Sequence, residues 1–178
     1  MSEKKLIPFY DMDNTIVEMS KYLVNSYSGR IKSYGSINGI SEEEIVKKLH
    51  EKGLFAKFHP IQNSQATLKK LSKIGYTINI ISQPMINEHC IMEKNYTLRK
   101  HFPMVDLRNV TYTFNKYLLA GNGRVLIDDN IDHLEKWEKM GGIAVCFVRG
   151  YNKNWKGLKV KKHQEIFKLL EKLEKEHE

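Results

Sequence analysis

The sequence predicts an α/β protein whose core is a doubly wound, mostly parallel sheet, with a small helical cap inserted after the first strand. Short apolar segments of strand length alternate with amphipathic segments of helix length, and 178 residues suffice for one domain with a small insertion. A polar and aromatic stretch, 15–59, interrupts this alternation directly after the first strand. We therefore expect a core of residues 1–14 and 60–178 and a cap of residues 15–59.

The first half of the core follows from its periodicity. The apolar run 5–10 is typical of a buried strand. Apolar positions repeat with a helical period over 62–74, and Gly75 ends that helix. A strand is then predicted over 76–81, and 87–101 suits a helix.

The second half repeats the pattern. Residues 110–114 are β-branched and aromatic, which favours a strand, and 124–127 form a short buried strand. A helix over 130–140 stops at two glycines and leads into a strand over 143–148. An amphipathic helix follows Lys161 and is expected to pack on the sheet. The whole order is that of a Rossmann-like core.

The 15–59 segment carries turn signals and one clear helix signal. The turns are at Ser28-Gly29, Tyr34-Gly35 and Asn38-Gly39. Ser41 and Glu44 have the spacing of a capping box, which opens a helix to about Glu51. Since the segment leaves the core beside the end of the first strand, it is a candidate lid. Its aromatic residues could stack a base, but most are expected to form the cap's own core: Tyr22, Tyr27, Tyr34, Phe55 and Phe58.

Composition excludes several classes of protein. No apolar stretch approaches the roughly 18 residues of a membrane helix, so no membrane partner is expected. Cys90 and Cys146 lack a metal-ligand spacing and are expected to be small core residues, with a cytoplasmic location as the default. The net charge of +8 favours anionic partners, although solvated helix faces explain most of the lysines. The sequence does not predict an oligomeric state.

Polar residues fall at the ends of four predicted strands. They are Asp11 and Asp13 after the first strand, Ser82 after the second, Lys116 after the 110–114 strand, and Asp128 and Asp129 after the 124–127 strand. In a parallel sheet these ends share one edge, so the side chains are expected to converge there. Each signal alone also has a structural interpretation, since aspartates form turns and helix caps, but their joint register favours a site.

The chemistry that these residues suit is phosphoryl transfer. Acidic side chains at one edge repel one another unless a cation lies among them. Oxygen ligands without a Cys/His cluster indicate Mg²⁺. A lysine and a hydroxyl, here Lys116 and Ser82, are the groups that bind the non-bridging oxygens of a phosphate.

The residues also resemble a known family. Asp-x-Asp-x-Thr, Ser, Lys and Asp-Asp, in this order over residues 6 to about 150, resemble the motifs of the haloacid dehalogenase superfamily of phosphotransferases. Within it the chain resembles the 5′(3′)-deoxyribonucleotidases. Similar to their motifs are Asp11-Met12-Asp13, Ile81-Ser82-Gln83-Pro84-Met85, Glu93-Lys94-Asn95-Tyr96 and Leu126-Ile127-Asp128-Asp129.

The resemblance implies a role for each residue. Asp11 is the expected nucleophile, and Asp13 the acid and base that serves the leaving group and then the water. Ser82 and Lys116 are expected to bind the phosphoryl group. The implied Mg²⁺ ligands are Asp11, the backbone carbonyl of Asp13, and either Asp128 or Asp129.

The chain departs from the family pattern at four positions. Asn14 stands where glycine is usual, Met19 where a phenylalanine shapes the nucleoside pocket, Phe114 in place of an arginine, and Gln83 in place of a second hydroxyl residue. Met19, Gln83 and Met85 are the expected substrate-pocket residues. Base and sugar preference do not follow from the sequence.

The resulting prediction is a magnesium-dependent phosphomonoesterase that dephosphorylates (deoxy)ribonucleoside monophosphates through an aspartyl-phosphate. A polynucleotide end phosphatase or a phosphatase of another small metabolite is the alternative, with nucleic acid a less favoured partner than a small phosphomonoester. Transfer to an acceptor other than water stays open. An alternative of a different class is a phosphate-binding module without catalysis.

Overall fold

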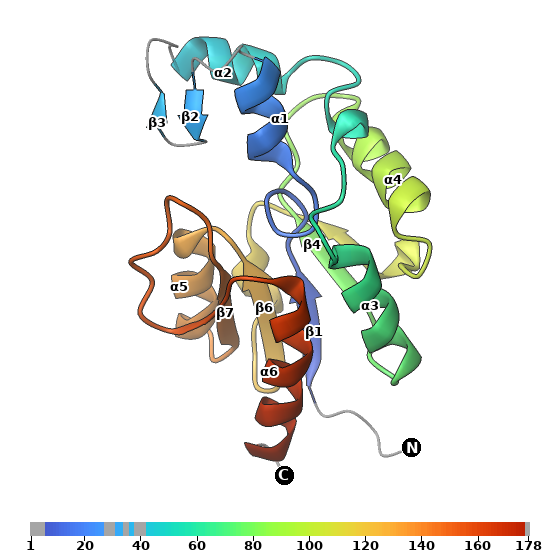
Figure 1. Ribbon diagram of the computed structural model, residues 1–178, viewed down its shortest axis with the longest axis vertical. Coiled ribbons are helices and arrows are strands. Elements are labelled where there is room, and N and C mark those ends of the chain that lie inside the picture. The colour runs from blue at the N-terminus through green and yellow to red at the C-terminus, as the bar shows by residue number, and fades with distance from the viewer. Residues whose placement is uncertain (1–5, 27–30, 34–35, 38–41, 177–178) are drawn as a thin grey trace.

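The computed structural model describes residues 6–26, 31–33, 36–37 and 42–176, and its centre is a six-stranded sheet (Figure 1). Every neighbouring pair of strands in this sheet is parallel, in the order β5-β4-β1-β6-β7-β8. The predicted α/β class and parallel sheet are therefore confirmed. The strands are β1 (Ile7–Tyr10), β4 (Asn79–Ser82), β5 (Val110–Tyr112), β6 (Arg124–Asp128), β7 (Ile143–Phe147) and β8 (Leu158–Val160).

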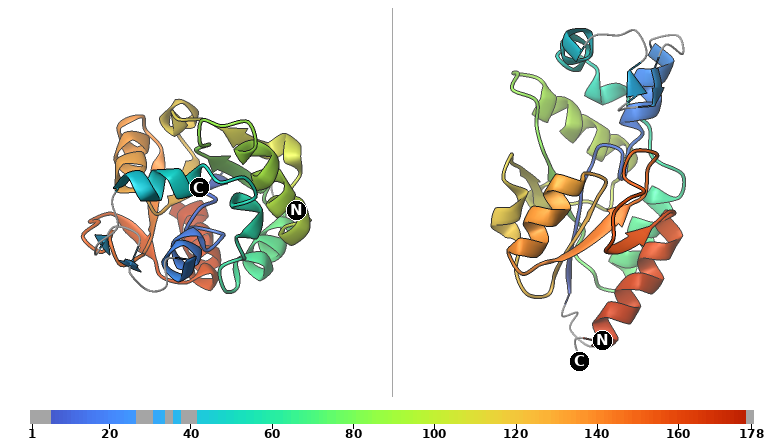
Figure 2. Two further views of the ribbon diagram at one scale, coloured as in Figure 1. Left: turned by 90° about the horizontal axis from the view of Figure 1, so that it is seen from above. Right: turned by 90° about the vertical axis from the view of Figure 1, so that its left-hand side faces the viewer.

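Helices cover both faces of the sheet, as Figure 2 shows for α5 and α6. They are α3 (Ser64–Lys73), α4 (Cys90–His101), α5 (Ile131–Lys139) and α6 (His163–Glu176). Successive residues of β6 point to opposite faces, so Val125 and Ile127 join the apolar cluster that includes α3 and α6, whereas Leu126 joins the cluster of α5. Cys90 and Cys146 are buried free thiols, as predicted. Across the described part of the chain, none of the helices combines the length and apolarity needed to span a bilayer.

The 15–59 segment lies beyond the carboxyl ends of the strands (Figure 1). It contains α1 (Met19–Ser26), α2 (Glu42–Leu49), a 3-10 helix, η1 (Phe55–Lys57), and an antiparallel pair, β2 (Ile31–Ser33) and β3 (Ser36–Ile37), that the sequence did not indicate. The turn signals at 28–29, 34–35 and 38–39 and the capping residue Ser41 lie outside the described residues. Where the segment meets the core, its two ends bond to each other: Glu18 N donates to His59 O at 2.8 Å and Ile61 N to Ile16 O at 2.9 Å.

β4 and β8 differ most from the predicted strands, and β5 ends at Tyr112 rather than at residue 114. β4 begins at Asn79 rather than at residue 76, because β1 is short and its pairing with β4 starts at Phe9 and Asn79. β8 was not predicted, because Leu158-Lys159-Val160 is too short and too polar to read as a buried strand. Two further 3-10 helices are η2 (Leu107–Asn109) and η3 (Lys116–Leu119).

Candidate active site

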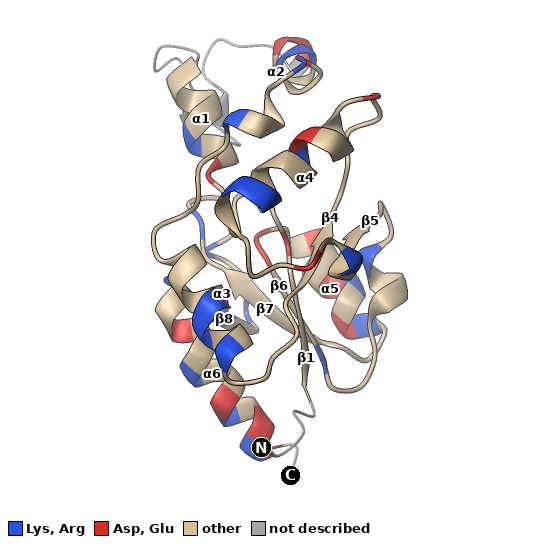
Figure 3. Cartoon of the chain, turned by 90° about the vertical axis from the view of Figure 1, so that its right-hand side faces the viewer, with Lys and Arg blue, Asp and Glu red and all other residues tan. Residues whose placement is uncertain are grey.

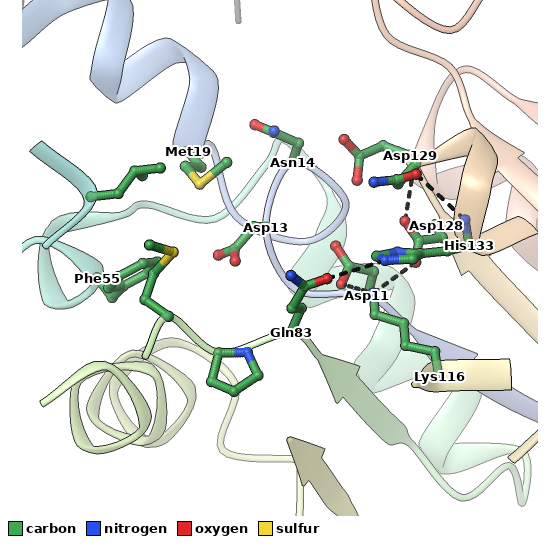
Figure 4. A pocket seen from close by; sticks show the side chains of 14 residues that line it. Asp11, Asp13, Asn14, Met19, Phe55, Gln83, Lys116, Asp128, Asp129 and His133 are labelled. Carbon is green, nitrogen blue, oxygen red and sulfur yellow. Dashed lines mark hydrogen bonds and ion pairs between the residues drawn. The ribbon is translucent and has the colours of Figure 1, made fainter. Parts of the chain in front are cut away.

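The predicted polar residues meet at the carboxyl edge of the sheet. Figure 3 shows acidic residues at the ends of β1 and β6, whereas α3 bears lysines on its outer side. Asp11 directly follows β1, and Ser82 and Asp128 are the last residues of β4 and β6. A pocket of about 190 Å³ opens here (Figure 4). The predicted residues that line it are Asp11, Asp13, Met19, Gln83, Met85, Lys116, Asp128 and Asp129.

Lys116 lies between two buried carboxylates. Its Nζ donates to Asp11 Oδ1 and, at 2.7 Å, to Asp128 Oδ2. The prediction placed Lys116 at the end of a strand. In the structure it begins η3, four residues beyond β5, and this short helix turns the side chain back toward β1 and β6. Lys116 is buried, so its charge interacts with these carboxylates rather than with solvent.

A tight turn follows Asp11 and explains the first departure from the family pattern. Asn14 has φ +58°, a left-handed conformation that asparagine tolerates better than most residues. Its Oδ1 also accepts a hydrogen bond from Ser20 N at 2.7 Å, in the first turn of α1. Two carbonyls of this turn face side chains from the carboxyl-terminal part of the chain. Arg149 Nε donates a hydrogen bond to Asn14 O at 2.7 Å, and His163 Nε2 lies 2.8 Å from Thr15 O.

The adjacent aspartates Asp128 and Asp129 have different surroundings. Asp128 accepts from Lys116 and from Asn130 N, and its Oδ2 lies 3.1 Å from His133 Nδ1. Asp129 accepts from two neutral hydroxyls, those of Tyr151 and, at 3.4 Å, Thr15. Thus Asp128 has a cationic partner, whereas Asp129 has none among the described residues.

Burial and charge shift the pKa values accordingly. Burial raises the pKa of Asp11 to about 6, against the opposing effect of Lys116. Burial also raises the pKa of Asp129 well above its ordinary value, and the nearby Asp128 adds to the effect. For Asp128 burial acts in the same direction, but Lys116 and His133 outweigh it and lower its pKa.

The donor set at this edge fits a hard divalent cation. Asp11, Asp128 and Asp129 each offer a carboxylate oxygen, and these atoms lie within 4.8 Å of one another. Two oxygens bound to the same Mg²⁺ at 2.1 Å are at most about 4.2 Å apart, so small side-chain rotations suffice. All three donors are oxygens, which Mg²⁺ prefers.

Lys94 is a site residue that the sequence reading did not single out. It is fully buried in α4, and its Nζ donates to Asp13 Oδ2 at 2.5 Å, Ser82 Oγ at 2.8 Å and Gln83 O at 2.9 Å. Neither Ser82, which was expected to bind the phosphoryl group, nor Lys94 lines the pocket; Lys94 connects the Ser82 hydroxyl to Asp13, which does. A signal was present: Lys94 lies one helical turn from both Cys90 and Leu98, so a charge stands on the apolar face.

Glu93, the neighbour of Lys94, connects α4 with the 15–59 segment. Its buried carboxylate accepts from the backbone amides of Gly53 and Phe55, the latter at 3.0 Å. Thr97 Oγ1 donates to Phe55 O at 2.7 Å. Phe55 is thereby fixed in the pocket wall, with Lys94 Nζ 5.0 Å from the centre of its ring.

His133 is a second residue that sequence reasoning missed. Its Nε2 lies 3.3 Å from Gln83 Oε1, and its Nδ1 faces Asp128 (Figure 4). Gln83, a departure from the family pattern, therefore contacts α5 across the pocket. No spacing in the sequence marks His133, which is separated from Gln83 by fifty residues.

The fold is shared with solved structures of haloacid dehalogenase-type hydrolases. A dehalogenase in complex with an intermediate has 12% identity and a TM-score of 0.66, with 95% of this chain and 98% of that chain covered. A hydrolase of this class from Deinococcus radiodurans, with bound phosphate and sodium, has 11% identity and a TM-score of 0.61 over 96% and 97%. One from Ehrlichia chaffeensis has 14% identity and a TM-score of 0.57 over 97% and 98%.

The family itself is given by the sequence. Residues 5–175 match the family described as "5' nucleotidase, deoxy (Pyrimidine), cytosolic type C protein", and the chain belongs to that family. The expected resemblance is confirmed, and the protein is an enzyme of the phosphatase type. No curated protein sequence matches the chain.

Proposed function

We propose that this protein is a magnesium-dependent phosphomonoesterase that forms an aspartyl-phosphate on Asp11 and acts on (deoxy)ribonucleoside monophosphates. One observation supports it most: the buried Asp11 stands beside Lys116, Asp128 and Asp129, while Asp13 keeps an oxygen without a hydrogen-bond partner among the described residues. A nucleophile, a cation site and a proton carrier are thus within one small pocket. The family match supports a nucleotide as substrate.

The first step is attack by Asp11 on phosphorus. A bond forms between an Asp11 oxygen and phosphorus while the bond to the leaving nucleoside oxygen breaks, and Asp13 donates a proton to that oxygen. Lys116 lines the pocket and binds the non-bridging oxygens, where charge must be neutralised, whereas Lys94 is fully buried beside the pocket and holds Asp13 and the Ser82 hydroxyl. In the second step Asp13 takes a proton from water, which attacks phosphorus and frees Asp11.

Asp129 is the better candidate for direct contact with the metal. Asp128 is already neutralised by Lys116, whereas Asp129 is buried with hydroxyl partners and a raised pKa. We assign Asp11, the Asp13 carbonyl and Asp129 as ligands, and Asp128 as the residue that fixes Lys116. When bound, Mg²⁺ supplies positive charge to the phosphoryl oxygens.

We assign the 15–59 segment as a cap over this pocket. Met19, Leu49, Phe55 and Met85 form an apolar wall opposite the aspartates. A pocket of about 190 Å³ suits one small phosphomonoester. A cytoplasmic location is part of the proposal, and the cytosolic type named in the family description supports it.

The test is turnover of a panel of nucleoside 5′- and 3′-monophosphates, and of p-nitrophenyl phosphate, with MgCl₂. Asp11→Asn should lower kcat by at least about 1,000-fold, because the covalent route is lost. Asp106→Asn is a matched control, since Asp106 is an exposed cap of η2 before β5. Full turnover by the Asp11→Asn variant contradicts the role of Asp11. Absence of turnover by the unmutated protein favours the binding module instead.

A further inference from the structure

A basic hollow lies beside the catalytic pocket, along the last two strands of the sheet. It has a volume of about 820 Å³ and is lined by Arg149, Lys153, Lys159 and Lys161, together with Val148 and Gly150. No carboxylate from the described residues is part of this lining. We refer to it as the basic hollow.

The basic hollow continues the edge on which the catalytic residues stand. Arg149 follows β7 and Lys161 follows β8, and Val148 N donates to Val160 O at 2.8 Å, so the two strand ends are adjacent. Parallel strands lie about 4.8 Å apart, which puts the end of β8 about 10 Å from the end of β6. Along one edge, the side chains thus change from acidic at β1 and β6 to basic at β7 and β8.

The same loop borders both cavities. Arg149 donates to the carbonyl of Asn14, and Tyr151 donates to Asp129; both acceptor residues line the catalytic pocket. Residues 149–151 therefore connect the lining of the basic hollow with the wall of the catalytic pocket. Figure 1 places this loop at the end of the core that faces the 15–59 segment.

The lysines of the basic hollow are available to a ligand. Lys153 and Lys161 are exposed, and within the described parts of the chain neither ammonium is paired with a carboxylate. Lys159 donates to Trp155 O at 2.6 Å, which leaves two of its three protons free. A smaller hollow of about 320 Å³ shares Arg149 and Lys161 and adds Lys162; its carboxylate, Glu18, is paired with Arg149 at 3.4 Å.

We propose that the basic hollow binds the phosphodiester backbone of a single-stranded oligonucleotide whose terminal phosphate enters the catalytic pocket. Two adjoining hollows form a strip of cations, which suits successive phosphates better than a single one. The terminal part of this proposal rests on the proposed function of Asp11. It extends the substrate from a mononucleotide to the end of a strand.

Binding is measured separately from turnover. The Asp11→Asn protein is titrated by fluorescence anisotropy with a ten-residue oligothymidylate that carries a phosphate at one end and fluorescein at the other, in both polarities. The logarithm of the affinity should fall with the logarithm of salt with a slope of about −2 for three phosphate contacts. Between 50 and 200 mM NaCl this is about a 20-fold loss. The strand without its terminal phosphate should bind more weakly.

The double variant Lys153→Gln/Lys161→Gln tests the location. It should reduce the slope to about −0.7, because two contacts are lost, and leave dTMP turnover unchanged in the enzyme with Asp11 intact. The matched control is Lys168→Gln/Lys172→Gln, which removes the same charge from exposed positions further along α6. That control should retain a slope of about −2.

Four results overturn the proposal. The Asp11→Asn protein does not bind the strand, or both double variants reduce the salt slope equally. Alternatively, the affinity is the same with and without the terminal phosphate, or dTTP competes as strongly as the unlabelled strand. The last result makes the hollow a nucleotide site instead. If the unmutated enzyme binds the strand but hydrolyses no phosphomonoester, the proposed function is refuted and the oligonucleotide site in the basic hollow is not. If the enzyme hydrolyses dTMP but binds no strand, only the oligonucleotide site is refuted.

Discussion

Replacement of Lys116 by methionine tests whether the buried carboxylates of Asp11 and Asp128 depend on the ammonium group between them. Methionine has a similar length but no charge, so Lys116→Met leaves Asp11 and Asp128 buried without the ammonium that lies between them. Removing one partner of a buried ion pair costs about 3–5 kcal/mol of folding free energy. We expect a loss of this size at pH 8 in EDTA.

The pKa of Asp11 determines how the stability deficit of Lys116→Met changes with pH. Burial already raises the pKa of Asp11 to about 6 in the intact protein, and loss of Lys116 raises it further. A carboxyl group whose folded pKa lies above its unfolded pKa stabilises the folded state least at high pH. The deficit of Lys116→Met should therefore be largest at pH 8 and shrink toward pH 5, where Asp11 becomes protonated.

Urea unfolding at pH 8 and pH 5, with EDTA or 10 mM MgCl₂, measures this deficit. Mg²⁺ should restore more stability to the variant than to the parent, because it replaces a lost positive charge. Lys136→Met is the control: Lys136 pairs with Asp132 on the surface, so its replacement should leave the stability close to that of the parent at both pH values. A deficit below about 1 kcal/mol at pH 8, or one that does not change with pH, refutes the reasoning.

Three other changes give defined outcomes. Tyr151→Phe removes a donor to Asp129 and should weaken Mg²⁺ binding by about 10-fold in calorimetry; an unchanged affinity speaks against Asp129 as ligand. Burial lowers the pKa of His163 to about 4 in the folded protein, below the unfolded value of about 6.5. Protonation of His163 therefore favours the unfolded chain, and stability is lost as the pH falls through this interval. From pH 7.5 to 4.5 the parent should lose about 2.5 kcal/mol that His163→Gln does not lose, measured by urea unfolding. Asn14→Ala should cost about 2 kcal/mol and Asn14→Gly about 1 kcal/mol, since only alanine adds left-handed strain to the lost bond with Ser20; equal costs contradict this.

The sheet and the strand-end residues could be predicted because they depend on local patterns. Apolar runs of four to six residues between helical segments define parallel strands, and parallel strands place their carboxyl ends at one edge. Asp11, Ser82 and Asp128 need no further information than this. β8 was not predicted because its position depends on pairing with β7 rather than on its own apolarity.

The remaining site residues depend on tertiary contacts. Lys94 belongs to the site because the packing of α4 brings its buried side chain to Asp13, and His133 because the first turn of α5 faces Gln83. Lys116 was found by motif order, but its true position, in a 3-10 helix, depends on a turn that the sequence does not mark. The β2–β3 pair is short and lacks the alternation that identifies a strand.

The attachments of residues 15–59 constrain how a ligand can enter and leave. The segment is bonded to the core near both of its ends, through Asn14 and Ser20 at one and through Glu93 with Gly53 and Phe55 at the other. Rigid-body swinging of the whole segment would break all of these bonds together. Access is therefore expected to come from movement of α2, which lies between these attachments and places Leu49 in the pocket wall, so product release should be sensitive to substitutions in α2 although it carries none of the assigned catalytic groups.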